Sequence, residues 1–263
     1  MLKVLDLFSG IGGFSLGLEA TKGFQTIAFC EIDPFCRKVL AKHWPDVSCF
    51  EDITKLGESE LHDLGQVDVI CGGFPCQDIS CAGKGAGIHA ARSGLWWEML
   101  RIIRLVRPRY VLVENVAALL NRGLDEVLGS LAESGYDAEW QMLSASSVGA
   151  PHRRERVFVV AHARGKYWSG KYIFTKNGGN SDKWWNDSKK WGLDWEFPEM
   201  GTKTIPGLPR MWKGCEDQTR VCRMDDGISG GIHLNNRLRG LGNAICPPVA
   251  QYVGQCVLDF DNR

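Results

Sequence analysis

The chain has 263 residues, a mass of 29.3 kDa, 44% hydrophobic residues and a formal net charge of zero, as expected for a folded protein with an ordinary core. No stretch reaches the roughly 20 continuous apolar residues of a membrane span, and residues 1–6 lack the apolar core of a signal peptide. The ten cysteines are dispersed and form no Cys-x-x-Cys pair, which argues against a disulfide scaffold and against a zinc site. We therefore expect an intracellular protein with reduced thiols and no metal.

A strand, a glycine-rich turn and a helix are predicted at the N-terminus. The run 3–8 is apolar, residues 9–13 contain three glycines, and residues 14–18 have the apolar spacing of a helix. Such a turn lets a ligand lie against main-chain amides at a helix start. The glycine spacing differs from the dinucleotide fingerprint, which argues against NAD.

Acidic residues follow the next two predicted strands. The run 24–30 predicts a strand that ends at Glu31, where a carboxylate could accept hydrogen bonds from ribose hydroxyls. The alternative for Glu31 is a favourable charge at a helix start, beside a cap at Asp33. Asp52 follows a weak strand signal at 47–50, and either binds a ligand amine or caps a turn.

A cysteine stands on a glycine-rich turn after the next predicted strand. The run 67–71 predicts a buried strand, and residues 72–76 read Gly-Gly-Phe-Pro-Cys. Because Pro75 restricts the backbone and the glycines allow close approach, the thiol of Cys76 is placed for nucleophilic chemistry. The alternative is that Cys76 is a small buried hydrophobe, as most free cysteines are. Residues 82–87 are glycine-rich and could form either a mobile lid or a plain linker.

Glu114 is a second candidate, at the end of the apolar strand predicted for 110–116. A carboxylate there is costly to bury without a partner, which favours a ligand. The basic run 152–156 precedes another predicted strand at 157–161. Its arginines could hold a carboxylate or phosphate, or could guard an exposed sheet edge.

Strands alternate with helices through residues 1–163, which predicts an α/β domain with a mainly parallel sheet covered on both faces. The candidate residues fall at strand ends, where ligands bind in such folds. Residues 164–223 differ, because they hold 12 Lys and Arg against 7 Asp and Glu, and six of the ten tryptophans. A basic, aromatic segment can follow a phosphate backbone and pack on bases, or can be a solvated face around a small core.

Taken together, the ordered motifs resemble those of the DNA (cytosine-5)-methyltransferases. The matching segments are 6–14, 31–33, 52–53, 74–77 (Phe-Pro-Cys-Gln), 114–116 (Glu-Asn-Val), 152–156 and 242–244. The resemblance implies a Rossmann-like, S-adenosylmethionine-dependent methyltransferase sheet with an antiparallel last strand. It also implies three parts: a catalytic and donor-binding domain (1–163), a small target-recognition region (164–235) and a C-terminal segment that packs back on the catalytic domain (236–263).

The resemblance further implies a role for single residues. Cys76 would be the nucleophile that adds to carbon 6 of a flipped cytosine, while Glu114, Arg154 and Arg156 would surround the base. The loop 80–91 would close over it. S-adenosyl-L-methionine would be the methyl donor, S-adenosyl-L-homocysteine the product, and no metal would be needed. Ten residues would line the donor pocket: Phe8, Gly10, Gly12, Glu31, Ile32, Asp52, Ile53, Pro75, Leu95 and Asn243.

Two departures from the family pattern stand out. His152 replaces the usual glutamine, and since both side chains can donate a hydrogen bond we expect activity to survive. The usual arginine-led helix with a Gly-Phe-Pro turn is not evident before Gly242. The recognition part is short, which resembles compact members encoded by phages and prophages.

We expect double-stranded DNA as the partner of a monomeric, cytoplasmic enzyme without membrane association. A restriction endonuclease partner is possible but not implied. Two alternatives stay open: a tRNA cytosine-5 methyltransferase and a catalytically inactive nucleic-acid-binding relative. An NAD-dependent oxidoreductase would leave residues 74–77 unexplained.

Overall fold

The computed structural model describes residues 1–75, 94–150, 153–164, 173–174 and 243–262. Several predictions concern parts of the chain outside these described residues: the nucleophile Cys76, the closing loop 80–91, His152, and nearly all of the recognition region 164–235. The rest of the predicted catalytic domain can be compared directly with the structure.

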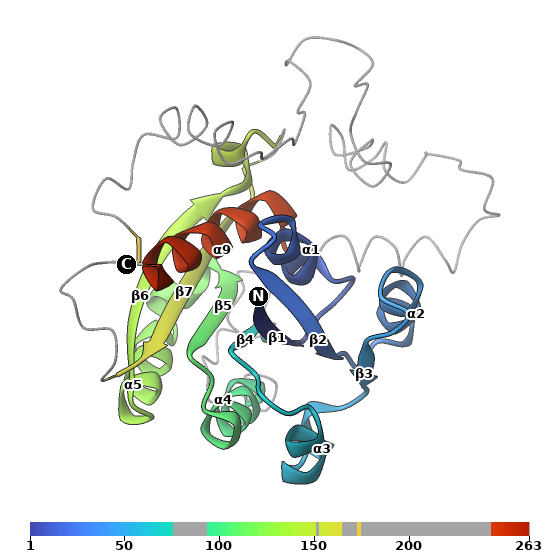
Figure 1. Cartoon of the computed structure of the whole chain (residues 1–263). Helices are drawn as coiled ribbons and strands as arrows, with labels where there is room; N and C mark the ends of the chain where they lie inside the picture. The colour runs from blue at the N-terminus through green and yellow to red at the C-terminus, as the bar shows by residue number, and fades with distance from the viewer. Residues whose placement is uncertain (76–93, 151–152, 165–172, 175–242, 263) are drawn as a thin grey trace, which may run out of the picture.

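Seven strands form a single sheet (Figure 1). They are β1 (Leu2–Leu7), β2 (Phe24–Cys30), β3 (Ser48–Phe50), β4 (Val69–Gly72), β5 (Tyr110–Val116), β6 (Tyr136–Ser144) and β7 (Glu155–Ala163). The order is β3-β2-β1-β4-β5-β7-β6. The first five strands pair in parallel, and β7 runs antiparallel to both β5 and β6. The predicted Rossmann-like sheet with an antiparallel last strand is therefore confirmed.

Helices cover both faces of this sheet. They are α1 (Gly13–Ala20), α2 (Pro34–His43), α3 (Glu58–Asp63), α4 (Leu95–Val106), α5 (Leu124–Glu133) and α9 (Pro247–Asp261), with short 3-10 turns η1 (Ile53–Lys55), η2 (Ala117–Asn121) and η3 (Ala145–Val148). None of the helices in the described part of the chain is long and apolar enough to cross a membrane.

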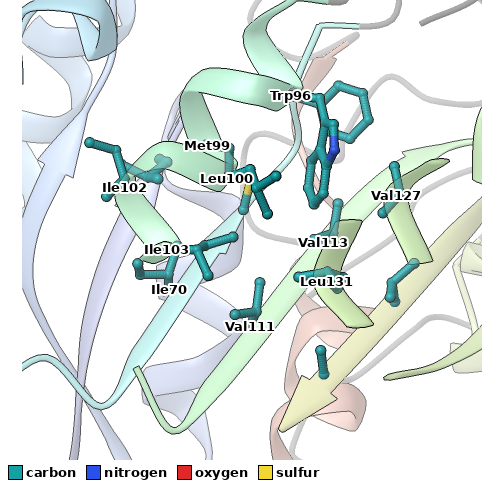
Figure 2. Packing of buried hydrophobic residues seen from close by; sticks show 14 of the residues in the cluster. Ile70, Trp96, Met99, Leu100, Ile102, Ile103, Val111, Val113, Val127 and Leu131 are labelled. Atoms are coloured by element: carbon teal, nitrogen blue, oxygen red, sulfur yellow. The ribbon is translucent and has the colours of Figure 1, made fainter. Parts of the chain in front are cut away.

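Alternation along the strands divides the core into two clusters. On β5, Val111 and Val113 join the cluster under α4 and α5, whereas Tyr110 and Leu112 join the cluster under α1 and α9. Figure 2 shows the first cluster, in which α4 packs against the strands with its buried apolar side chains. The buried side chains of α4 recur at helical spacing, which explains why this segment is a helix. They are Trp96, Met99, Leu100, Ile102 and Ile103.

The C-terminal helix α9 packs closely on α1 because glycines line the contact. A Cβ on Gly17 of α1 would lie 2.2 Å from the carbonyl oxygen of Pro247, and one on Gly254 of α9 would lie 2.8 Å from Leu18. Pro247 and Pro248 begin the helix, where their missing N–H groups cost nothing. Residues more than 200 positions apart in sequence thus lie side by side, on α1 and α9 (Figure 1).

Residues 173 and 174 also pack on the sheet. Ile173 and Phe174 are buried in the cluster under α1 and α9. Their backbone N–H groups donate to the carboxylate of Glu139 on the edge strand β6, at 2.7 and 3.1 Å. Part of the chain beyond residue 163 is therefore fixed to the sheet domain.

Candidate active site

The candidate site lies at the carboxyl ends of adjacent strands. The register pairs Leu7 of β1 with Cys30 of β2 and with Gly72 of β4, and Gly72 in turn with Val113 of β5. The segments that follow these four positions consequently emerge at one edge of the sheet. They carry the glycine turn, Glu31, the Gly73–Pro75 turn and Glu114.

The N-terminal glycine turn has a backbone that most side chains would strain. Phe8, Gly10 and Gly12 have positive φ angles of 54°, 55° and 85°. A Cβ on Gly12 would lie 2.6 Å from the Trp44 ring, whereas one on Gly10 would meet no atom within 4 Å. The turn is thus packed on one side and open at Gly10, which leaves room for a ligand.

Glu31 fixes the shape of this turn. Its Oε2 accepts a hydrogen bond from the backbone N–H of Gly10 at 2.7 Å, and its Oε1 accepts one from the N–H of Asp33 at 2.8 Å. Each carboxylate oxygen has a second lone-pair direction, so ribose hydroxyls could still be bound. The neighbouring Ile32 side chain is 70% exposed, and it offers an apolar surface beside that carboxylate. Asp33 is the N-cap of α2 and accepts a hydrogen bond from the N–H of Phe35, so the predicted cap is present, while ribose binding by Glu31 stays a prediction.

Asp52 and Ile53 serve local structure in the described contacts. Asp52 caps η1 by accepting hydrogen bonds from the N–H and the hydroxyl of Thr54 at 3.0 and 2.8 Å. These bonds hold the pKa of the Asp52 carboxyl below its ordinary value. The Ile53 side chain is 5% exposed and belongs to the core cluster under α4. The turn-cap interpretation of Asp52 is thus the one that the structure displays.

Three further donor-pocket candidates lie next to parts of the chain outside the described residues. Pro75 is half-buried at the end of the β4 turn, and Leu95 opens α4 and packs against the core. Asn243 is exposed at the start of the C-terminal segment. The structure brings Phe8, Gly10, Gly12 and Glu31 together, whereas it places Ile53 in the core.

Glu114 is a buried carboxyl beside a cation. It is 7% exposed, and its Oε1 lies 3.0 Å from Nε of Arg156. Burial raises the pKa of Glu114, and the positive charges of Arg156 and Arg154 oppose that rise. Apart from this contact with Arg156, Oε1 has no hydrogen-bond partner among the described residues. An acid in this setting keeps capacity to bind a polar ligand edge.

Asn115 holds the turn that precedes Cys76, a role that the sequence analysis missed. Its Nδ2 donates to the carbonyl of Phe74 at 3.2 Å, while its Oδ1 accepts from the N–H of Val116 at 2.8 Å. The Phe74 ring packs against Trp96 at 5.4 Å between centroids. The sequence did contain a signal for this role, because Asn115 is an amide side chain directly after Glu114 at the end of a predicted strand.

Asp6 is a second residue that the sequence analysis did not single out. It is 1% exposed beneath the glycine turn, and its Oδ2 accepts a hydrogen bond from the Ser15 hydroxyl at 2.7 Å. Burial raises the pKa of Asp6 to about 7, despite hydrogen bonds from Ser15 and Cys71 that act in the opposite direction. The buried carboxyl joins β1 to the first turn of α1.

Arg154 reaches the C-terminal segment. Its Nη2 donates to the carbonyl of Ala244 at 2.7 Å, and its backbone has a positive φ of 31°. Arg153, the preceding residue, is 85% exposed and pairs with Glu155 on the surface. The basic run therefore contains one solvent-facing arginine and two that face the site. No cluster of His, Cys, Asp and Glu that could hold a metal ion occurs in the parts of the chain that the structure describes.

Comparison with known proteins identifies relatives of this chain. A family model described as C-5 cytosine-specific DNA methylase matches residues 2–196. The Type II methyltransferase M2.BsuMI of Bacillus subtilis is 40% identical over 168 residues, which are 61% of this chain and 42% of that protein. M.CviJI of Paramecium bursaria Chlorella virus IL3A is 35% identical over 202 residues, 76% of this chain and 53% of that protein. The chain thus spans about two fifths to half of the length of these relatives.

Solved structures share the fold. The S. pombe Dnmt2 methyltransferase superposes with a TM-score of 0.63 at 18% identity, covering 99% of this chain and 100% of that one. The Entamoeba histolytica methyltransferase EhMeth superposes with a TM-score of 0.67 at 16% identity, covering 100% and 99%.

Proposed function

Because the chain belongs to the C-5 cytosine-specific DNA methylase family, we propose that it transfers a methyl group from S-adenosyl-L-methionine to carbon 5 of cytosine in DNA. The observation that carries this proposal is the Glu114 carboxyl, which is buried at the end of β5 with Arg156 3.0 Å away. A buried acid with a raised pKa retains its proton more readily, so it can donate a hydrogen bond to ring nitrogen 3 of a cytosine.

The nucleophile in this proposal is Cys76, which lies outside the described residues. Carbon 5 of cytosine is too weak a nucleophile to accept a methyl group unaided. The Cys76 thiolate adds to carbon 6, and the electron pair of the 5,6 double bond moves onto carbon 5 and the ring edge. Glu114 stabilises that charge at nitrogen 3 and accepts from the exocyclic amine. Carbon 5 takes up the methyl group with this electron pair, and S-adenosyl-L-homocysteine is the leaving group. Loss of the carbon 5 proton then restores the 5,6 double bond and expels the Cys76 thiolate.

The residues at the N-terminal turn fit an S-adenosyl donor. Space is open at Gly10, Glu31 has lone pairs left for hydroxyl groups, and Ile32 presents an exposed apolar surface suited to a flat heterocycle. When bound, S-adenosyl-L-methionine supplies the electrophilic methyl group. The turn residues Phe8 and Gly12 hold the backbone in the open shape, and Pro75, Leu95 and Asn243 complete the proposed wall.

Access to a cytosine requires base flipping, since carbon 6 is shielded inside a stacked duplex. We assign recognition of the DNA to the basic, tryptophan-rich region 164–235, on the strength of its composition. The monomeric state, the cytoplasmic location and the absence of an obligatory endonuclease stay predictions from the sequence.

The proposal is tested by incubating the purified protein with S-adenosyl-L-methionine labelled in the methyl group and with DNA of mixed sequence, followed by nucleoside analysis. Label in 5-methylcytosine, lost in the Cys76→Ala variant, supports the proposal. Label in tRNA but not in DNA would move the chain to the RNA-methylating branch, and no label in either would indicate an inactive relative.

A further inference from the structure

We propose that Arg154 is a positioning residue for the methyl-donor site, acting through the backbone of the linker that precedes α9. The inference rests on the proposed function and deepens it, because Arg154 was assigned only to the base pocket. The linker is defined here as residues 244–246.

Arg154 is attached to the linker directly. Its Nη2 donates to the carbonyl of Ala244 at 2.7 Å, a charge-assisted hydrogen bond between residues 90 positions apart in sequence. The backbone of Arg154 has a φ of 31°, which an L-residue adopts at an energetic cost. Such a conformation persists only where surrounding contacts hold it, and the hydrogen bond to Ala244 is one of these contacts.

The linker lies directly against the N-terminal glycine turn that would bind the methyl donor, called the donor turn below. The carbonyl oxygen of Ile245 occupies the place beside Gly13 so closely that a Cβ there would lie 2.4 Å away. Gly13 begins α1 and directly follows Gly12 of the donor turn. The position of the linker therefore sets how far the donor turn can move outward.

The linker also lies near Gly73 and Glu114, where the target cytosine would bind. The Cδ1 of Ile245 lies 3.9 Å from the position of a Cβ on Gly73, and that same position is 2.8 Å from Oε2 of Glu114. Ile245 thus lies against the donor turn with its backbone and near Gly73, beside Glu114, with its side chain. Arg154 also interacts electrostatically with Glu114, so it is connected to both halves of the site.

Arg156 provides the matched comparison. Its contacts within the described residues are with Glu114 and with the carbonyl of Glu155, and neither belongs to the linker. If Arg154 acted only on the base, removing either arginine would leave the affinity of the free protein for the donor unchanged. If it acts through Ala244, only the Arg154 variant weakens that affinity.

The experiment is isothermal titration calorimetry of S-adenosyl-L-homocysteine into the full chain without DNA, for the parent, Arg154→Met, Arg156→Met and the surface control Arg153→Met. We expect Arg154→Met to weaken binding roughly tenfold and the other two to stay within about twofold of the parent. Arg154→Lys, which keeps a donor for the Ala244 carbonyl, is expected to recover part of the loss. Thermal unfolding of each variant verifies folding.

The outcomes distinguish failure of the Arg154 role from failure of the proposed methyl transfer. Unchanged affinity in a folded Arg154→Met would overturn the inference and leave the proposed function standing. A loss in Arg156→Met as large as that in Arg154→Met would equally overturn it. If Arg154→Met does not fold, Arg154→Ala takes its place, and parent-like affinity in that variant would overturn the inference. A parent that binds no S-adenosyl-L-homocysteine would overturn the proposed function together with the inference.

Discussion

The carboxyl of Glu114 fits beside Gly73 because Gly73 has no side chain: a Cβ there would lie 2.8 Å from Oε2 of Glu114 and 3.5 Å from its carbonyl oxygen. The β4 turn that leads to Cys76 and the carboxyl at the end of β5 are therefore packed directly on one another. The two segments can approach this closely because Gly73 carries a hydrogen atom where alanine would carry a methyl group.

Gly73→Ala is expected to lower kcat for DNA methylation by roughly ten- to a hundredfold. The added methyl group displaces the Glu114 carboxyl, which then no longer aligns with the hydrogen-bonding edge of the cytosine. Calorimetry without DNA should show parent-like donor affinity. Gly129→Ala on α5 is the matched control, since a Cβ there meets nothing within 4 Å and α5 is a helix. Parent-like kcat in Gly73→Ala would show that the contact is not needed for catalysis.

Glu114→Gln should lower activity by about two to four orders of magnitude, because an amide cannot share its proton with the ring. It should also make the fold more stable in alkaline solution. Burial raises the pKa of Glu114, so the folded state holds more protons than the unfolded state above the ordinary carboxyl pKa, and the parent loses stability as pH rises through that window. Urea titrations of both proteins check this, and a variant less stable than the parent at high pH would contradict it.

Asp6→Asn tests the second buried carboxyl. The pKa of Asp6 is raised from 3.8 to about 7, so the parent should lose stability between about pH 4 and pH 7 and then level off. Relative to the parent, the variant should gain about 2 to 3 kcal/mol in free energy of unfolding between pH 5 and pH 8. Urea titrations at both pH values measure the gain, with the exposed Asp63→Asn as control. Identical pH slopes for parent and Asp6→Asn would contradict the argument.

Glu139→Ala should release the contact of residues 173 and 174 with β6. Two backbone N–H groups lose a charged acceptor, which should lower the free energy of unfolding by about 1 to 3 kcal/mol. Hydrogen exchange of the Ile173 and Phe174 amides should accelerate in the variant. Glu133→Ala, at an exposed helix end, serves as the control. Unaltered exchange at both amides would mean that the Glu139 carboxylate does not hold them.

Much of the fold could be predicted because strand ends are local signals. The apolar run at 3–8 leads into the glycine-rich turn 9–13, and the run at 110–116 contains Glu114 near its end. The structure places the strands at Leu2–Leu7 and Tyr110–Val116. Even the weak signal at 47–50 corresponds to β3, Ser48–Phe50. The helix α3 was not predicted, since Leu61 is its one buried residue and the segment has almost no apolar periodicity.

The site was only partly predictable, because several of its contacts join distant residues. The hydrogen bond from Arg154 to Ala244, and that from Asn115 to Phe74, leave no pattern within either segment. The burial of Ile53 in the core cluster under α4 likewise depends on packing against distant residues, and its predicted part in the donor pocket stays a prediction.

The central claim is covalent attack by Cys76 on a cytosine held by Glu114, and a mechanism-based trap tests it most directly. DNA in which 5-fluorocytosine replaces cytosine is incubated with the protein and S-adenosyl-L-methionine, because fluorine cannot leave carbon 5 as a proton does and the thiol cannot then be eliminated. The account predicts a denaturation-resistant protein–DNA complex whose modified peptide contains Cys76, absent in Cys76→Ala and strongly reduced in Glu114→Gln. Methylation of normal DNA without any such complex, or a complex through another cysteine, would contradict it.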